Sequence, residues 1–199
     1  MRQGDRDATQ PQARDRAEPA PPTATHRVDS GAADQCAQDL GARTRRLLAE
    51  AGYLTLATAD ADGTPWSAVL QYAWLDDPPR FLFGSATCSR HSRHVAERPR
   101  VGGSLFVTGT SLLDVDGAQF SGTCRELTAA EVDRYHATFY DAVLPDPDAR
   151  TRWTLPPAAL LPPADHRLYV VEVDRWWLVD TSTWEQDRID RRVEAPLAG

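Results

Sequence analysis

The chain has 199 residues, of which 41% are hydrophobic, so it can form one domain of ordinary size with its own core. Its formal net charge is −7, which argues against a protein that binds nucleic acid through bulk positive charge. No apolar run approaches the roughly 18 residues of a membrane span, and the N-terminus has no apolar signal core, so we expect a cytoplasmic protein with no membrane partner.

The composition divides the chain into a domain and two tails. Residues 1–36 contain no Phe, Trp or Tyr and a single branched aliphatic residue, Val28. Such a segment cannot bury enough surface to offset its chain entropy. We therefore expect a disordered N-terminal tail over residues 1–36, a folded domain over 37–185 and a loose, charged C-terminal tail over 186–199.

The first half of the domain predicts one helix followed by strands. Leu40, Leu47 and Leu48 share one face of a helix that ends at Gly52. Strand-like runs follow at 53–59, 64–74 and 80–85, and a turn over 60–63 separates the first two. Alternate positions of the long strand 64–74 form an aromatic stripe, which we expect in the core or at a subunit interface: Trp66, Tyr72 and Trp74.

The second half predicts two more strands, a helix and a closing strand region. The strands are expected at 101–107 and 117–127, and Thr128 with Glu131 forms a capping box that opens a helix. A Pro-rich loop and one or two strands up to residue 179 follow. Strands at short spacing with flanking helices indicate a mainly β fold, a small antiparallel barrel. The glycine-rich loop of a Rossmann domain is absent from the sequence.

The segment from Ser85 to Pro99 predicts a binding site for an anion. It follows a hydrophobic run and opens a short basic helix, whose free N–H groups and positive dipole end favour negative charge. Thr87 or Ser89 can cap this helix, and Arg90 can place two N–H groups on a phosphate. All 22 basic residues are Arg, so a lysine Schiff base is excluded and a phosphate has to be held by Arg, His, hydroxyl or backbone groups.

With its elements in this order, the sequence resembles a known family. The strands, the Ser89-Arg90-His91 turn, the short helix, the Arg-Pro-Arg-Val run and the Gln119-Phe-Ser-Gly122 strand are similar to the FMN-binding split barrel of pyridoxamine 5′-phosphate oxidase-like proteins. The resemblance covers about residues 42–140 and weakens toward residue 180. It implies a six-stranded antiparallel split barrel of the FMN-binding type, a homodimer, and a flavin at the subunit interface.

The resemblance also implies which residues bind the cofactor. Arg90 matches the Arg of the family's phosphate-binding motif, His91 takes the place of a Lys, and Ser85 matches a hydroxyl at the end of the third strand. The family's second strand runs along the flavin ring with its backbone, and Gln119 is the nearest candidate for a Gln that often reaches the ring. The predicted set is Ser67, Ala68, Val69, Leu70, Gln71, Ser85, Ser89, Arg90, His91 and Gln119.

Together these features predict an FMN-dependent oxidoreductase that acts on an unidentified small molecule. No acid–base pair and no Ser-His-Asp arrangement stands out, so no catalytic residue is assigned, as is expected when the cofactor carries the chemistry. The true pyridoxamine phosphate oxidase reaction is disfavoured, because its substrate-phosphate signature near the C-terminus is not legible. Trp184 and Arg188 resemble the late flavin-contacting Trp and Arg of the true oxidases, at a shorter spacing.

Two alternatives on the same fold stay open. A non-catalytic protein can store flavin, or bind haem with His91 or His94 as the axial ligand. A reductase that uses the deazaflavin F420 needs additional arginines for the longer acidic tail of that cofactor, and three lie nearby in sequence: Arg93, Arg98 and Arg100.

The cysteines favour neither a disulfide framework nor a metal site. Three scattered cysteines, Cys36, Cys88 and Cys124, fit reduced thiols. Cys88, His91 and His94 are spaced three apart, as zinc ligands can be, but no fourth ligand is evident and we predict no metal.

Overall fold

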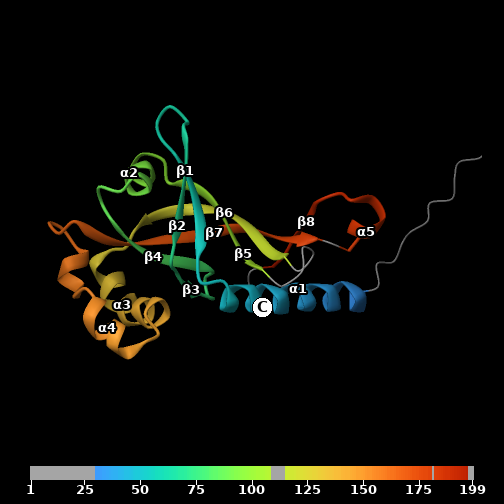
Figure 1. Cartoon of the computed structure of the whole chain (residues 1–199), viewed down its shortest axis with the longest axis horizontal. Helices are drawn as coiled ribbons and strands as arrows, with labels where there is room; N and C mark the ends of the chain where they lie inside the picture. The colour runs from blue at the N-terminus through green and yellow to red at the C-terminus, as the bar shows by residue number, and fades with distance from the viewer. Residues whose placement is uncertain (1–29, 109–114, 181, 197–199) are drawn as a thin grey trace, which may run out of the picture.

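The computed structural model describes residues 30–108, 115–180 and 182–196. Within them, antiparallel strands form one eight-stranded sheet, which curls into a half-barrel with helices outside it (Figure 1). The strands are β1 (Leu54–Ala59), β2 (Pro65–Leu70), β3 (Ala73–Leu75), β4 (Arg80–Ala86), β5 (Arg100–Thr108), β6 (Val115–Glu126), β7 (His166–Asp180) and β8 (Arg191–Glu194). The helices are α1 (Ser30–Glu50), α2 (Arg90–Glu97), α3 (Ala129–Val143), α4 (Pro147–Trp153), the 3-10 helix η1 (Pro157–Leu160) and α5 (Trp184–Asp187).

The strand order explains why the sheet curls. The order is β2-β1-β5-β6-β7-β4-β3, and β8 pairs with the second half of β7. β2 and β3 thus lie at opposite edges of the sheet, although only Gln71 and Tyr72 separate them in sequence. Because the three steps from Leu70 to Ala73 span at most about 11 Å, the two edges must come close together, and a flat sheet cannot satisfy this.

Tyr72 marks the point where the chain crosses between the two edges. Its hydroxyl lies 3.0 Å from the carbonyl oxygen of Leu48 and 2.8 Å from that of Ala51, at the end of α1. Burial of the ring raises the pKa of Tyr72 to about 12, so the hydroxyl keeps its proton and remains a donor. The contact ties the crossing to α1 and turns the side chain into the core.

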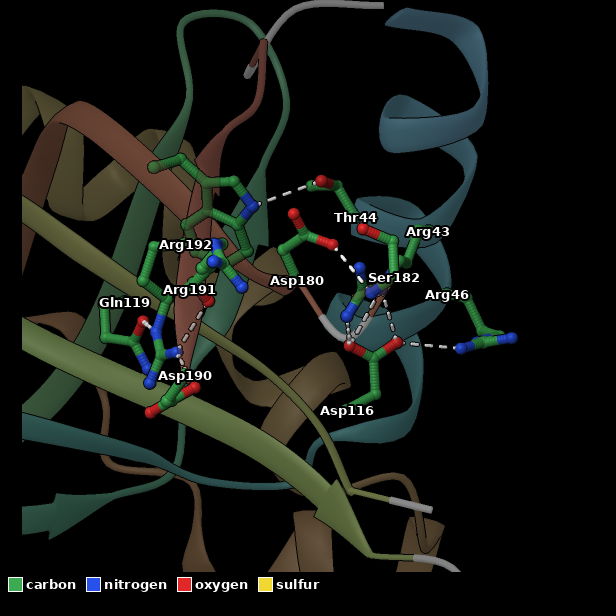
Figure 2. Close-up of polar contacts among 11 residues, drawn as sticks. Arg43, Thr44, Arg46, Asp116, Gln119, Asp180, Ser182, Asp190, Arg191 and Arg192 are labelled. Carbon is green, nitrogen blue, oxygen red and sulfur yellow. Dashed lines mark hydrogen bonds and ion pairs between the residues drawn. The ribbon is translucent and has the colours of Figure 1, made fainter. Parts of the chain in front are cut away.

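The core has two parts, one on each face of β4 and β7. The half-barrel interior is filled mainly by aromatic and branched side chains, among them Phe81, Phe120 and Trp176. α1 covers this interior with Leu47, and the Trp176 indole donates to the Thr44 hydroxyl at 3.1 Å (Figure 2). α3 packs against the other face of β4 and β7 and forms the second part.

The predicted fold class, a mainly β split barrel with flanking helices, is confirmed, but the number of strands differs. We expected six strands and a continuous strand over 64–74. The structure breaks that run into β2, which pairs with β1, and β3, which pairs with β4. The break lies at Gln71 and Tyr72, where the Tyr72 hydroxyl donates to carbonyl oxygens at the end of α1.

The boundaries of the predicted tails also differ. α1 begins at Ser30, inside the segment predicted to be disordered, and residues 1–29 lie outside the described residues. In the tail expected to be loose, β8 pairs with β7, and the Glu194 carboxylate accepts two hydrogen bonds from Arg175. β8 has a single apolar residue, Val193, so its own sequence does not predict a strand. Its pairing with β7 and its charge pair with Arg175 depend on a distant segment.

The described helices contain no segment with the length and apolar character that a membrane crossing requires.

Candidate functional site

A network of polar side chains gathers where β4 ends and α2 begins. The Ser85 hydroxyl lies 2.8 Å from His91 Nε2, and the Ser89 hydroxyl lies 3.1 Å from both. Ser89 also donates to the Ser92 hydroxyl at 2.8 Å. Three of the predicted residues, Ser85, Ser89 and His91, are therefore in direct contact.

Ser89 positions the start of α2, as the sequence predicts. It is the N-cap residue, and its hydroxyl accepts a hydrogen bond from the backbone N–H of Ser92. The other N–H groups of the first turn have no partner within a helix, and the positive end of the helix dipole lies at the same place. The hydroxyl groups of Ser85 and Ser89 thus stand beside a region of positive potential.

The two histidines of α2 are buried and held separately. Burial lowers the pKa of His91, and the neighbouring His94 lowers it further, so the His91 ring is neutral at pH 7. His94 Nδ1 lies 3.1 Å from the Thr58 hydroxyl of β1 in the interior. Each imidazole therefore has its own hydroxyl partner, and in the described part of the chain no three His, Cys, Asp or Glu side chains gather as metal ligands.

Arg90 contacts an aromatic ring instead of an acid. Its guanidinium carbon lies 4.8 Å from the ring centroid of Trp66 on β2. Among the described residues, no carboxylate or carbonyl oxygen accepts a hydrogen bond from this side chain. The arginines named for the F420 alternative differ, since Arg98 bonds to the Ala61 carbonyl and Arg100 to Asp174.

β2 presents its predicted residues on two faces. Ser67 and Val69 point outward, and Val69 is 70% exposed. Ala68 and Leu70 alternate with them and point toward the interior, where Leu70 packs against the core. Because β2 is an edge strand, the backbone N–H and C=O groups along its outer side have no strand partner among the described residues.

A cleft of about 320 Å³ opens beside this region, between α3, α4 and the strands β4 and β7. Gln71 and the backbone around Ser85 form part of its wall, and the aromatic ring of Phe139 and the side chains of Leu155 and Leu160 form another part. The His136 ring donates to the Leu155 carbonyl at 2.7 Å, which fixes the loop that follows α4.

Gln119 does not join the other predicted residues within one chain. It lies opposite Trp177 on β7, whereas Ser85 lies opposite Arg167, ten residues earlier on the same strand. Ten strand residues span on the order of 30 Å. Gln119 accepts a hydrogen bond from Arg192 of β8 (Figure 2). Trp184 and Arg188, in and next to α5, precede the same β8 strand.

One residue near the site was not predicted. Arg167 is the cross-strand partner of Ser85, so the two side chains share a face of the sheet. Arg167 is 8% exposed, forms an ion pair with Glu126 at 3.3 Å and donates to the Ala164 and His166 carbonyls. Nothing in the local sequence marks this arginine, because its place depends on the pairing of β4 with β7.

Comparisons with solved structures support the fold. The chain is similar to a heme binding protein from Mycobacterium smegmatis, with 18% identity and a TM-score of 0.57, over 78% of this chain and 57% of that one. It thus spans little more than half of that protein. It is also similar to a heme storage protein from Vibrio cholerae, with 16% identity and a TM-score of 0.52, over 68% of this chain and 90% of that one. A third similar structure is a FAD-binding protein from Mesorhizobium loti, with 19% identity and a TM-score of 0.50, over 66% of this chain and 88% of that one.

Sequence comparison places the chain in a family. No curated protein matches it. Residues 40–180, which include every strand from β1 to β7 and the network around His91, match the profile of pyridoxamine 5′-phosphate oxidase. Because this match spans more than half of the chain, the protein belongs to the pyridoxamine 5′-phosphate oxidase family.

Proposed function

We propose that this protein is an FMN-dependent oxidoreductase whose cofactor phosphate binds at the start of α2. The observation that carries the proposal is the Arg90 guanidinium, which has no hydrogen-bonded acidic partner among the described residues and belongs to the residue that directly follows the Ser89 cap of α2. A phosphate monoester needs several hydrogen-bond donors and positive charge, and this set fits that need. The free outer edge of β2 offers backbone groups to the polar edge of a flavin ring.

The sheet offers a surface for a second copy of the chain. Cross-strand partners place Val69, Thr55, Ser104, Gln119 and Trp177 in one row across β2, β1, β5, β6 and β7. This outer row is uncharged and points away from the core, and Phe106 beside it is 58% exposed. We propose that the protein is a homodimer through this face, which would let Gln119 of one copy approach a flavin held by the other.

The cleft next to Ser85 is the place that we propose for the small-molecule substrate. Its volume of about 320 Å³ is at the low end of the roughly 300–1,000 Å³ of ligand pockets, so it suits a molecule of one or two rings. Gln71 and His166 supply polar groups, and Phe139, Leu155 and Leu160 supply an apolar wall that excludes water.

The residues of the chain bind and orient rather than react. A bound flavin supplies hydride or electron transfer. Ser85 and Ser89, whose hydroxyls the neutral His91 ring orients, would hold the phosphate through hydrogen bonds, while Arg90 would balance its charge. We place the protein in the cytoplasm, where the free thiols Cys36 and Cys124 stay reduced.

The structure gives less support to the other cofactors. His91 and His94 are 8% and 6% exposed, so neither ring presents a nitrogen at the surface as an axial ligand to haem. Arg98 and Arg100 are bonded elsewhere, which removes two of the three arginines that the F420 alternative needs. FMN therefore remains the best candidate, although two similar structures are of heme proteins.

Absorbance and size measurements test the proposal. The purified protein is expected to show the two-banded visible spectrum of a bound flavin, or to acquire it on titration with FMN, and to run as a dimer on size-exclusion chromatography. Anaerobic addition of NADH or NADPH then tests for reduction of the flavin. A Soret band would indicate haem instead, and a colourless monomer that binds no FMN would refute the proposal.

A further inference from the structure

We infer that Trp66 is a positioning residue, which holds the Arg90 guanidinium flat so that its N–H groups face a phosphate. The inference rests on the proposed function and extends it to a residue outside the predicted cofactor-binding set. Trp66 lies on β2 and Arg90 is the first residue of α2, so the cation–π contact, with 4.8 Å between the guanidinium carbon and the ring centroid, joins the strand proposed to contact the flavin ring to the helix proposed to bind its phosphate.

A stacked guanidinium keeps its hydrogen-bonding capacity. The five N–H groups of an arginine lie in the plane of the group, so an aromatic ring against its face leaves all of them available. A free arginine on the surface loses up to about 2 kcal/mol of side-chain entropy when it is fixed. A ring that fixes the guanidinium beforehand reduces this cost at the moment of binding.

Asp60 lies close enough to Arg90 to interact with the arginine charge, but its carboxylate is bonded to the backbone. The carboxylate of Asp60 accepts hydrogen bonds from the backbone N–H groups of Thr64 at 2.8 Å and Asp62 at 3.1 Å. These bonds, that of Thr64 above all, lower the pKa of Asp60. The acid therefore stabilises the turn between β1 and β2 and does not occupy the donors of Arg90.

A second arginine stacked on a tryptophan shows what differs at Arg90. The Arg175 guanidinium lies 4.7 Å from the Trp177 ring, but it also donates two hydrogen bonds to Glu194. Its donors hold β8 in place. In the described residues, Arg90 contacts a tryptophan ring but donates to no carboxylate. This is the arrangement expected of a cation that can bind an external anion.

FMN and riboflavin together give the test, because they differ only in the phosphate. Trp66→Leu is expected to weaken FMN binding about three- to tenfold, the range of a partly exposed cation–π contact, and to change riboflavin binding less than about twofold. Trp66→Tyr keeps an aromatic face and should retain most of the FMN affinity. Both ligands are titrated by flavin fluorescence, and circular dichroism checks that each variant is folded.

A double-mutant cycle decides whether Trp66 acts through Arg90. In an Arg90→Ala background, Trp66→Leu should have no further effect on FMN binding. Tyr53→Leu is the matched control, since Tyr53 is 56% exposed and no arginine stacks on it among the described residues. This variant should bind both ligands as the wild type does.

Three results would overturn the inference. Equal weakening of FMN and riboflavin by Trp66→Leu would mean that Trp66 contacts the ring or stabilises the fold. An unchanged FMN affinity in Trp66→Leu, with a loss in Arg90→Ala, would refute the role of Trp66 and leave the phosphate site intact. A wild-type protein that binds neither ligand would refute the proposed function and this inference with it.

Discussion

The regions around the two ends of β7, next to β8 at one end and next to α2 at the other, use their polar side chains differently. At the β8 end, arginines are paired with acids. Arg191 pairs with Asp187, and Figure 2 shows the pairs of Arg192 with Asp190 and of Arg43 with Asp116. At the α2 end, the hydroxyls of Ser85 and Ser89 contact a neutral imidazole, and Arg90 contacts only an aromatic ring in the described part of the chain.

The charged side chains at the β8 end stabilise the fold, whereas the polar groups at the α2 end are available to a ligand. Paired charges at the β8 end tie α1, α5 and β8 to the sheet and leave little capacity for an external anion. At the α2 end, donors remain free beside a helix N-terminus, which is a favourable place for negative charge. Changes at the two ends should therefore affect different properties, stability at one and ligand affinity at the other.

The largest expected effect comes from Gly103 on β5, in the sheet and outside both regions. A Cβ at this position would lie 2.5 Å from the Thr55 carbonyl oxygen and overlap the ring of Phe120. Both neighbours are fixed within the sheet, so Gly103→Ala should lower the free energy of unfolding by about 3 kcal/mol. Thermal and urea unfolding measure this loss.

Gly102 offers the control, because a Cβ there would meet its nearest neighbour, the Phe120 carbonyl oxygen, at an ordinary 3.5 Å. Gly102→Ala should change stability by less than about 1 kcal/mol. If both variants were equally stable, the close approach of β5 to Phe120 would not constrain the sheet.

Arg90→Ala should affect the α2 end alone. The loss of a charge-assisted hydrogen bond to phosphate is expected to cost about 1.5–3 kcal/mol of FMN binding free energy. Because Arg90 has no acidic partner among the described residues, the free energy of unfolding without ligand should change by less than about 0.5 kcal/mol. Isothermal titration and urea unfolding measure the two quantities, and an unchanged FMN affinity would remove our placement of the phosphate.

Local chemistry made much of this end predictable from the sequence. Ser89 caps α2, and Thr128 and Glu131 form the expected capping box of α3. Such features depend on residues three positions apart, so they can be recognised without knowledge of the sheet. The end of α1 before Gly52 could be predicted from local sequence in the same way.

Pairings between distant segments could not be predicted in the same way. The contact of Arg90 with Trp66, the position of Arg167 opposite Ser85, and the distance of Gln119 from both depend on strand order and register. A pattern of alternating residues indicates which side chains share a face, but not which strand lies beside another. The sequence therefore predicts the residue types of the site better than its geometry.

Asp116→Asn tests the β8 end. The Asp116 carboxylate accepts hydrogen bonds from Arg43 and Arg46 and is 13% exposed (Figure 2). Burial raises the pKa of Asp116, but the hydrogen bonds and charges of the two arginines outweigh burial and leave the pKa below its usual value. We expect a loss of about 1.5 kcal/mol in the free energy of unfolding, since part of the charge pairing is screened by solvent.

The result of this substitution contrasts with that of Arg90→Ala. Asp116→Asn should leave FMN affinity within about twofold of the wild type, because Asp116 belongs to the end of the sheet that holds paired charges. A loss of FMN affinity without a loss of stability would reverse the roles that we assign to the two ends.

The smallest effect concerns a paired charge that lies near the α2 end. The pKa of Glu131 is lowered to about 2, mainly by hydrogen bonds from Arg125; burial opposes this shift, and the N–H and hydroxyl groups of Thr128 add to it. Because this pKa is lower in the folded than in the unfolded chain, the ion pair stabilises the protein above about pH 4.5 and is lost as the pH falls toward about 2. The Glu131 carboxylate is partly exposed and Arg125 more so, so solvent reduces the contribution of the pair to about 1 kcal/mol.

Glu131→Gln should therefore be less stable than the wild type at pH 7, and the two proteins should converge as the pH approaches 2 to 3. Urea unfolding at a series of pH values measures the difference. Its FMN affinity at pH 7 should equal that of the wild type, because Arg125 donates to Glu131, to Glu172 and to the Glu126 carbonyl and so belongs to the paired charges. An FMN affinity that falls with this substitution would show that paired charges near α2 also serve the ligand, and the contrast between the two ends would then no longer hold.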